Sequence, residues 1–259
     1  MMPPMKVPPR PRVGISACLL GQNVRYDGGH RRDPFLVDVL GKSVTYVPVC
    51  PEVEVGMGTP REPIRLERSR KGTRLVGVES GVDHTEAMVR FAERRVAALE
   101  ALDLSGYIFK KDSPSCGVER VRVFDPKGAA SRTGRGLFAQ HVMDRLPLLP
   151  VEDEGRLADP RVRANFLERV LAYRRLRTFF DGRWTPEKLA RFHAVESSLH
   201  LADDPKACAD LDRIAARSSS RPRSETAARY VSRTLAALAG RKILNPSVAM
   251  PVVRTRQPR

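Results

Sequence analysis

The chain has 259 residues, of which 41% are hydrophobic, and it contains only four cysteines. This length suits one large domain or two modest ones, and so few cysteines exclude a disulfide-stabilised scaffold. A membrane-spanning protein is excluded as well, because no stretch approaches the run of about 20 apolar residues that crosses a bilayer.

The formal net charge of +16 is unevenly distributed: residues 1–155 carry +4 and residues 156–259 carry +12. Clustered arginine and lysine gain free energy when they release condensed counterions from a polyanion, so the second part of the chain is a candidate phosphate-binding module. A solvated, arginine-rich surface is the alternative.

Residues 1–11 contain prolines where a secretory signal needs an apolar run, so we expect a flexible N-terminus and a cytoplasmic protein with reduced thiols. From residue 12 onward, strand and helix patterns alternate. β-Branched and aromatic runs predict strands at residues 13–17, 44–49, 64–66, 73–78, 107–109 and 147–151, the third and fourth forming a hairpin. Helical patterns cover residues 33–40, 83–102 and 136–146. This alternation predicts an α/β fold, a parallel sheet with helices on both faces.

From about residue 159 the pattern is helical throughout. The predicted helices are residues 161–180, 186–201, 204–216 and 224–238, with a basic, serine-rich loop at 217–224. We therefore expect a boundary near residues 152–158 and an all-α C-terminal domain. The predicted division is a flexible N-terminus (1–11), an α/β domain (12–155), a basic helical domain (156–250) and a basic tail (251–259).

Three of the cysteines occupy equivalent positions in the predicted sheet. Cys18, Cys50 and Cys116 each lie at or just beyond the carboxyl end of a predicted strand, and these ends face one crevice in an open parallel sheet. Converging thiolates suit a zinc site with an open position, an iron–sulfur cluster with one iron lacking a protein ligand, or a single nucleophilic cysteine with a nearby base. Three inert, buried thiols are the remaining alternative. Cys208, on an apolar helix face, is expected to be a small buried hydrophobe.

The residues around these cysteines favour a functional site. Glu52 follows Cys50 closely, and Ser113 and Ser115 precede Cys116, whereas inert cysteines usually have apolar neighbours. After Cys18, a glycine-rich turn brings donors, an acceptor and an aromatic ring within six positions; these residues are Arg25, Tyr26, Asp27 and His30.

Three ordered segments, ISACLLGQNVRYDGGH, PVCPEVEVGMGTPREPIRL and KKDSPSCG, resemble the signature of the thiouracil desulfidase family over roughly residues 12–152. The resemblance implies a Rossmann-like domain that holds a [4Fe-4S] cluster on Cys18, Cys50 and Cys116, with the fourth iron taking the sulfur of the substrate. Water then attacks the thiocarbonyl carbon without net redox chemistry.

The helical part is similar to a companion domain often fused behind this family's domain, through the segment WTPEKLARFHAVESSLHLADDP at residues 184–205. It departs from the usual pattern at Glu196-Ser197, where relatives have a histidine–lysine pair, and at Asp203-Asp204, where they have histidine–serine. Fused members resemble tRNA 4-thiouridine desulfidases, whereas single-domain members act on free thiouracil. A thiolated tRNA is therefore the expected partner, with no membrane partner.

The resemblance leads to specific expectations for the site. Glu52 is the expected general base, and Ser113 or Ser115 is expected to hydrogen-bond the substrate or the developing tetrahedral oxygen. The residues expected to bind the base or balance the charge of the cluster are Arg25, Tyr26, Asp27, His30 and Lys110. The residues expected to contact tRNA phosphates are Arg174, Arg175, Arg177, Arg221 and Arg223.

Two other functions are compatible with the same residues. The protein could act on free thiouracil, with a helical domain that serves only stability. It could also be a non-catalytic, metal-containing protein that binds or regulates RNA. Iron and acid-labile sulfide content separates the cluster hypothesis from a zinc protein.

Overall fold

The computed structural model describes residues 9–70, 72–200 and 204–241, so most of the predicted flexible N-terminus and the whole predicted basic tail lie outside the described residues. The chain divides into two compact units, Met1–Gly155 and Arg156–Arg259. The first is an α/β unit and the second is helical, which confirms the predicted fold class.

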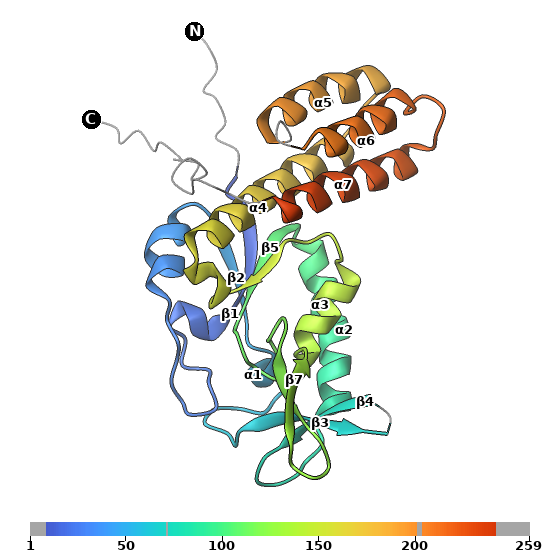
Figure 1. Cartoon of the computed structure of the whole chain (residues 1–259). Helices are drawn as coiled ribbons and strands as arrows, with labels where there is room; N and C mark the ends of the chain where they lie inside the picture. The colour runs from blue at the N-terminus through green and yellow to red at the C-terminus, as the bar shows by residue number, and fades with distance from the viewer. Residues whose placement is uncertain (1–8, 71, 201–203, 242–259) are drawn as a thin grey trace, which may run out of the picture. The chain divides into compact units, whose positions relative to one another are not determined.

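The core of the first unit is a four-stranded parallel sheet, sheet A, in the described residues (Figure 1). Its strand order is β2 (Thr45–Val49), β1 (Arg12–Ser16), β5 (Leu104–Phe109) and β8 (Val151–Asp153). All six residues of β5 are buried, as expected for a central parallel strand covered on both faces. The last strand begins at Val151 and not at Pro147 as predicted. Pro147 and Pro150 have no N–H to donate to a ladder, so the apolar run before Val151 is a turn.

Helices α2 (Thr85–Ala101) and α3 (Leu137–Arg145) lie side by side on one face of sheet A (Figure 1). The ring of Phe138 on α3 contacts Phe91 on α2 and the stacked pair Tyr107 and Phe109 on β5, whose centroids are 4.0 Å apart. Burial of each such side chain contributes roughly 1.5–3 kcal/mol, so this contact holds the helices against the sheet.

The opposite face of sheet A carries a short helical segment, η2 (Phe35–Val39) and η3 (Leu40–Lys42). The predicted helix at residues 33–40 is therefore present as one π turn followed by a 3₁₀ turn. Asp33 accepts a hydrogen bond from the backbone N of Leu36 at 2.9 Å, and Gly41 closely follows. A segment this short cannot propagate a regular α-helix.

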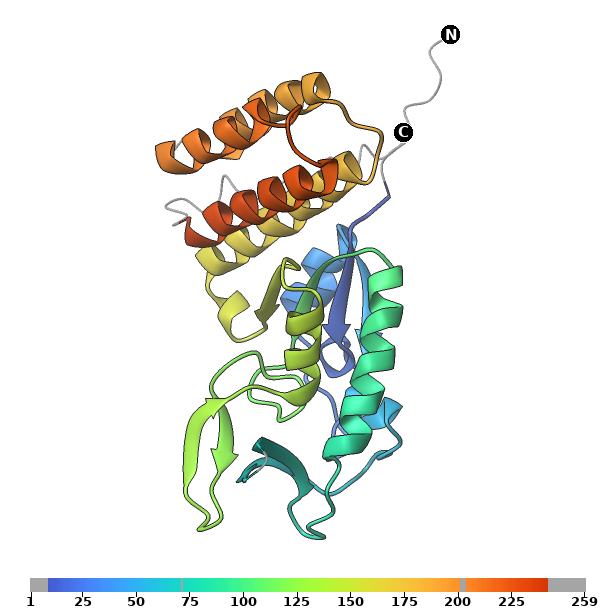
Figure 2. The same cartoon turned by 90° about the vertical axis from the view of Figure 1, so that its right-hand side faces the viewer.

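A second, mixed sheet, sheet B, contains β4 (Gly72–Gly77), β3 (Ile64–Ser69), β6 (Val121–Phe124) and β7 (Ala130–Gly134), in that order. The β3–β4 hairpin is confirmed, whereas the β6–β7 hairpin was not predicted because its strands are short and rich in polar residues. In Figures 1 and 2 sheet B lies beyond the carboxyl ends of β1 and β5. Sheet B can therefore form one wall of a site at those ends.

The second unit contains η4 (Arg156–Ala158), α4 (Pro160–Phe180), α5 (Pro186–His200), α6 (Pro205–Ala216) and α7 (Arg223–Gly240). Asp159 and Asp204 cap α4 and α6 by accepting hydrogen bonds from Arg161 N and Ala207 N. The rings of Phe180, Trp184 and Tyr230 pack together in its core. Among the described residues no helix is long and apolar enough to cross a membrane.

Candidate active site

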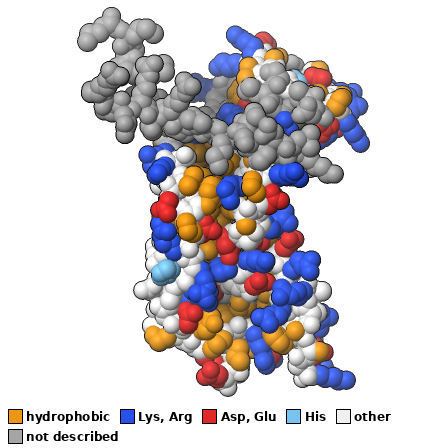
Figure 3. Space-filling view, turned by 60° about the vertical axis from the view of Figure 1, so that its left-hand side comes forward, with side chains coloured by type: hydrophobic (Ala, Val, Ile, Leu, Met, Phe, Trp, Pro, Cys, Tyr) orange, Lys and Arg blue, Asp and Glu red, His pale blue; other side chains and the backbone are white. Residues whose placement is uncertain are grey.

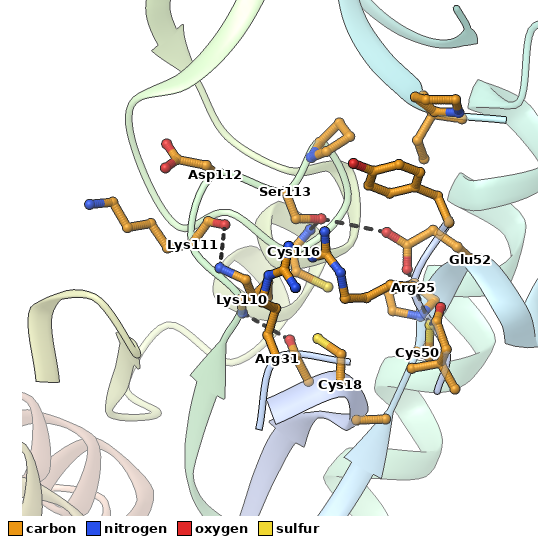
Figure 4. Close-up of a pocket in the computed structure, with 18 of the residues that line it drawn as sticks. Cys18, Arg25, Arg31, Cys50, Glu52, Lys110, Lys111, Asp112, Ser113 and Cys116 are labelled. Atoms are coloured by element: carbon orange, nitrogen blue, oxygen red, sulfur yellow. Dashed lines mark hydrogen bonds between the residues drawn. The ribbon is translucent and has the colours of Figure 1, made fainter. Parts of the chain in front are cut away.

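The order of strands in sheet A creates a crevice at its carboxyl edge. The chain passes from β1 to β2 on one side and then returns to place β5 on the other side of β1. At such a switch point the loops after the two strands separate and leave room for a ligand. A cavity of about 430 Å³ lies at these strand ends (Figure 4). We call it the cysteine cavity, because Cys18, Cys50 and Cys116 all line it.

Three different loops supply the three thiols. Cys18 lies in η1 (Ala17–Leu20), directly after β1. Cys50 lies between β2 and the short helix α1 (Pro51–Glu54), and Cys116 lies in the loop after β5. The first loop is closed by the carbonyl oxygen of Cys18, which accepts a hydrogen bond from Arg31 N at 2.9 Å.

The turn around Cys116 depends on its serine and glycine neighbours. Ser113 Oγ accepts hydrogen bonds from Ser115 N at 3.2 Å and from Cys116 N at 3.0 Å. A Cβ on Gly117 would collide with the side chain of Val121 and lie 2.8 Å from the carbonyl oxygen of Ser113, so only glycine fits there. These contacts fix the direction of the Cys116 thiol.

Burial dominates the acid–base properties of the three thiols. It raises the pKa of Cys18 to about 11, with a smaller contribution from the negative charge of Glu52. It raises the pKa of Cys50 to about 12 and that of Cys116 well above its ordinary value. These thiols therefore become thiolates only when a positively charged group binds them. Among the described residues, no group of three or more His, Cys, Asp or Glu side chains is gathered closely enough to hold a single metal ion. A four-iron cluster is larger, and its thiolate ligands bind different irons and so lie farther apart.

Glu52 lies among these thiols, on the first turn of α1, with only 11% of its side chain exposed. The thiol of Cys50 donates to its Oε2 at 3.4 Å, and Ser113 Oγ donates to its Oε1 at 3.5 Å. Figure 4 shows the carboxylate directed toward Ser113. Glu52 and Ser113, both predicted as catalytic, are thus brought together at the cysteine cavity.

Arg61 lies beside Glu52 and is not among the residues predicted from the sequence. Its Nη2 is 4.0 Å from Glu52 Oε2, and its side chain is 9% exposed. Its Nη1 donates to the carbonyl oxygens of Val24 at 3.0 Å and Gly58 at 2.8 Å. Arg61 therefore joins the loop after β1 to the loop after α1. The sequence held one indication of its role: Arg61 lies in GTPREP, which is part of the second of the three segments that resemble the family.

Of the four residues predicted in the turn after Cys18, two line the cysteine cavity and two do not. The guanidinium of Arg25 lies 5.2 Å from the centre of the Tyr26 ring, and Tyr26 is 43% exposed. Asp27 and His30 are exposed and shape the turn itself: Asp27 accepts from Gly29 N, and His30 Nδ1 accepts from Arg32 N. The hydrogen bond from Gly29, followed by the charge of Arg25, lowers the pKa of Asp27. Neither Asp27 nor His30 lines the cysteine cavity, and their contact with the base stays a prediction.

Ser115 lies apart from the cavity lining. It is fully buried, it does not line the cysteine cavity, and its Oγ has no hydrogen-bond partner in the described part of the chain. Its carbonyl oxygen accepts from Ala139 N at 3.1 Å, so this residue connects the cysteine turn to the start of α3. Its contact with the substrate stays a prediction.

The cavity wall is rich in cations. Lys110 lines it as predicted, and its ammonium group pairs with Glu154, which also accepts from Lys111 N at 2.7 Å. The described cationic residues of the lining are Arg25, Arg31, Arg61, Lys110, Lys111 and Arg122. Lys and Arg side chains are prominent on the face of this unit seen in Figure 3. Such a wall suits an anionic cluster or substrate.

Comparison with known proteins identifies the family. The family model described as 2-thiouracil desulfurase matches residues 13–154, which is more than half of the chain. The chain belongs to the 2-thiouracil desulfurase family. This confirms the resemblance stated from the cysteine segments.

The chain is similar to two known proteins. The chain is 33% identical over 108 residues to "Uncharacterized protein YbbK" of Bacillus subtilis strain 168, a match that spans 40% of this chain and 71% of that protein. It is 33% identical to a solved structure named [4Fe-4S]-dependent thiouracil desulfidase TudS, with a TM-score of 0.47 over 57% of this chain and 94% of that one.

The helical unit lies outside the match to the 2-thiouracil desulfurase family, and it holds all five arginines predicted to contact RNA. Arg175 donates to Glu196 at 2.8 and 3.2 Å, and Glu196 is almost fully buried. Arg177 pairs with Asp181 at 3.6 Å.

Arg223 lies 5.0 Å from the centre of the Trp184 ring, Arg221 pairs with Glu225, and Arg174 is half-buried on α4. Arg175 is held by an ion pair with a buried carboxylate, and its contact with RNA stays a prediction.

The departures from the companion-domain pattern have local explanations. Glu196 replaces a usual histidine and pairs with Arg175, and Asp204 caps α6 through Ala207 N. Asp203 lies outside the described residues. His193 of the same segment is buried between Tyr230, 2.9 Å from its Nδ1, and Asp212, 2.8 Å from its Nε2. These residues stabilise the helical unit.

Proposed function

We propose that the protein is a [4Fe-4S]-dependent desulfidase that converts a thiolated uracil base in tRNA to uridine. Among the thiolated bases, 4-thiouridine is the proposed substrate. The observation that carries this proposal is the cysteine cavity: two buried thiols and one half-buried thiol, from the loops after three strands, face one space, with Glu52 among them. Membership of the 2-thiouracil desulfurase family supports the reaction class.

The donor set fits a cluster with an open iron. Cys18, Cys50 and Cys116 can supply three thiolate ligands, and their raised pKa values mean that they lose their protons only when a positively charged group binds the sulfur in place of the proton. When bound, the cluster supplies a thiophilic Lewis acid for the sulfur of the thiocarbonyl group. Ordinary water hydrolysis of a thiocarbonyl is slow because sulfide is a poor leaving group.

Glu52 is placed to act as the general base. Its carboxylate takes a proton from the water that attacks the thiocarbonyl carbon, and the C=S bond is replaced by C=O as sulfur leaves as sulfide. No electrons are gained or lost. Ser113 Oγ, 3.5 Å from Glu52 Oε1, is within reach of the same water or of the tetrahedral oxygen, and Arg61 keeps the carboxylate in position.

Tyr26 and Arg25 are the residues that hold the base. Tyr26 presents an exposed aromatic ring at the cavity, on which a flipped-out base can stack. The adjacent guanidinium of Arg25 offers donors to the carbonyl groups of uracil. Turning the base out of its helix costs a few kcal/mol, which contacts to the RNA backbone can offset.

The charge of the second unit favours tRNA over a free base. Residues 156–259 carry a net charge of +12, and a small neutral base would gain nothing from it. The test is nucleoside analysis of thiolated tRNA after incubation with the anaerobically reconstituted full chain. We expect 4-thiouridine to disappear as uridine and sulfide form in equal amounts.

Other results would select the alternative functions. Desulfuration of free thiouracil without any reaction on tRNA would replace the RNA substrate by the free base. A protein that holds zinc, or that binds RNA and a cluster without releasing sulfide, would overturn the proposed activity.

A further inference from the structure

A second cavity, of about 640 Å³, lies between α6 and α7 of the helical unit. These helices run side by side in the described structure (Figure 1). We call this cavity the arginine groove, because five described arginines line it: Arg213, Arg217, Arg221, Arg229 and Arg233. Asp210 is the acidic residue of the described lining, so the groove carries a net charge of about +4.

The arginines form two rows along a floor of small residues. Arg213 lies on the last turn of α6 and Arg217 directly follows this helix, whereas Arg229 and Arg233 are four residues apart on α7. Four residues of helix rise about 6 Å, so guanidinium groups recur at successive turns along the α7 wall and at the end of α6. Ala228, Ser232 and Ala236, also four residues apart, line the groove and leave space between the walls.

Carboxylates hold four of these arginines without burying them. Asp210 accepts from Arg233 at 2.8 Å and pairs with Arg213, and Glu225 pairs with Arg221 and with Arg229 at 3.4 Å. Arg217 makes no side-chain hydrogen bond or ion pair with another described residue. Exposed ion pairs are worth about 0–1 kcal/mol, so a phosphate can displace the carboxylates at little cost.

We propose that the arginine groove binds the sugar–phosphate backbone of the RNA that carries the thiolated base. Guanidinium groups match phosphate oxygens with two parallel hydrogen bonds, and a repeating anion matches a repeating row of cations. The proposal rests on the proposed function for the identity of the RNA. A lipid surface is disfavoured, because Ile214 is the one large apolar residue of the described lining, where a membrane-binding helix needs several.

The test measures binding of unthiolated tRNA to the full chain, which needs neither the cluster nor catalysis. We expect Arg217→Glu to weaken binding about tenfold at low salt and to reduce the slope of log affinity against log salt by about 1. Arg217→Gln should give a smaller loss in the same direction. The matched control is Arg191→Glu, which makes the same charge change at an exposed position of α5 and should bind like wild type within about twofold.

Each outcome decides the proposal. Equal affinities for Arg217→Glu and Arg191→Glu would overturn it, as would binding of the wild-type chain to phosphatidylserine vesicles with no affinity for tRNA. Desulfuration of free 4-thiouracil by the reconstituted Arg217→Glu chain should stay at the wild-type rate. If neither the wild-type chain nor the variants have desulfidase activity, and Arg217→Glu alone binds tRNA more weakly, the proposed function is wrong but the proposal that the arginine groove binds RNA is supported.

Discussion

The cysteine cavity and the arginine groove hold their charged or ionisable groups in opposite ways. In the cavity Cys18, Cys116 and Glu52 are buried and Cys50 is half-buried, and backbone hydrogen bonds or near-buried side chains fix them. In the groove the arginines are exposed or half-exposed, and four of the five pair with exchangeable carboxylates. The two sites therefore meet different requirements. A cluster and a general base need fixed geometry, whereas an RNA backbone needs positive charges that can adapt to its position.

The largest expected effect comes from removing a thiol. Cys116→Ser should lose most of its iron and acid-labile sulfide after anaerobic reconstitution, and with them all desulfuration, because hydroxyl is a poor ligand for iron–sulfur clusters. Cys208→Ser, in α6, is the control and should keep both. A Cys116→Ser protein with a full complement of iron and sulfide would remove this cysteine from the ligand set.

Next in size is the loss of the proposed base. Glu52→Gln should retain iron and sulfide yet desulfurate at least about 100-fold more slowly, because the amide cannot accept a proton from water. Glu54→Gln is the matched control: Glu54 lies on the same short helix but pairs with Arg95 at 2.9 Å. Equal rates for the two variants would show that Glu52 is not the base.

A smaller effect is expected when Arg61 is replaced. Arg61→Met removes two hydrogen bonds to carbonyl oxygens and a cation near Glu52, so we expect roughly tenfold lower kcat and a free energy of unfolding lower by about 1–3 kcal/mol. Rates and denaturant curves measured beside Arg65→Met, an exposed control on β3, test this. If Arg61→Met loses stability but keeps full kcat, Arg61 is structural only.

The smallest expected effect concerns the affinity of the arginine groove for tRNA. Asp210→Asn should tighten tRNA binding about two- to threefold, because it frees Arg213 and Arg233 from their carboxylate. Hydrogen bonds from Arg233 and then Arg213 lower the pKa of Asp210. The stability from this carboxylate is therefore present above about pH 4 and is lost as pH falls through its lowered pKa. The free energy of unfolding of Asp210→Asn should lack this small decrease at acid pH. If the variant unfolds with the same pH dependence as the wild type and binds tRNA with the same affinity, both expectations are wrong.

The sequence was sufficient to locate the cysteines but not to orient their neighbours. Carboxyl ends of parallel strands share an edge of a sheet, so Cys18 and Cys50 could be placed together from strand patterns alone. Ser113 and Ser115 are two positions apart in an irregular loop with no period, so nothing in the sequence shows that only Ser113 lines the cavity.

Long-range pairing was the other obstacle. Arg175 appeared available for RNA because its partner Glu196 is 21 positions away on another helix. The arginine groove was missed for the same reason, since its two rows come from two helices joined by a loop. Helix existence could be predicted from periodicity and caps such as Asp159, whereas the β6–β7 hairpin lacked a strong apolar pattern.

The proposed function and the proposed role of the arginine groove together mean that the protein desulfurates a base in an RNA and binds the backbone of the same RNA. The most direct measurement is kcat/KM of the reconstituted chain for thiolated tRNA and for free 4-thiouracil at increasing salt. We predict that kcat/KM for tRNA falls steeply with salt while that for the free base stays constant. Equal salt dependence for the two substrates, or a higher kcat/KM for the free base at low salt, would contradict the account.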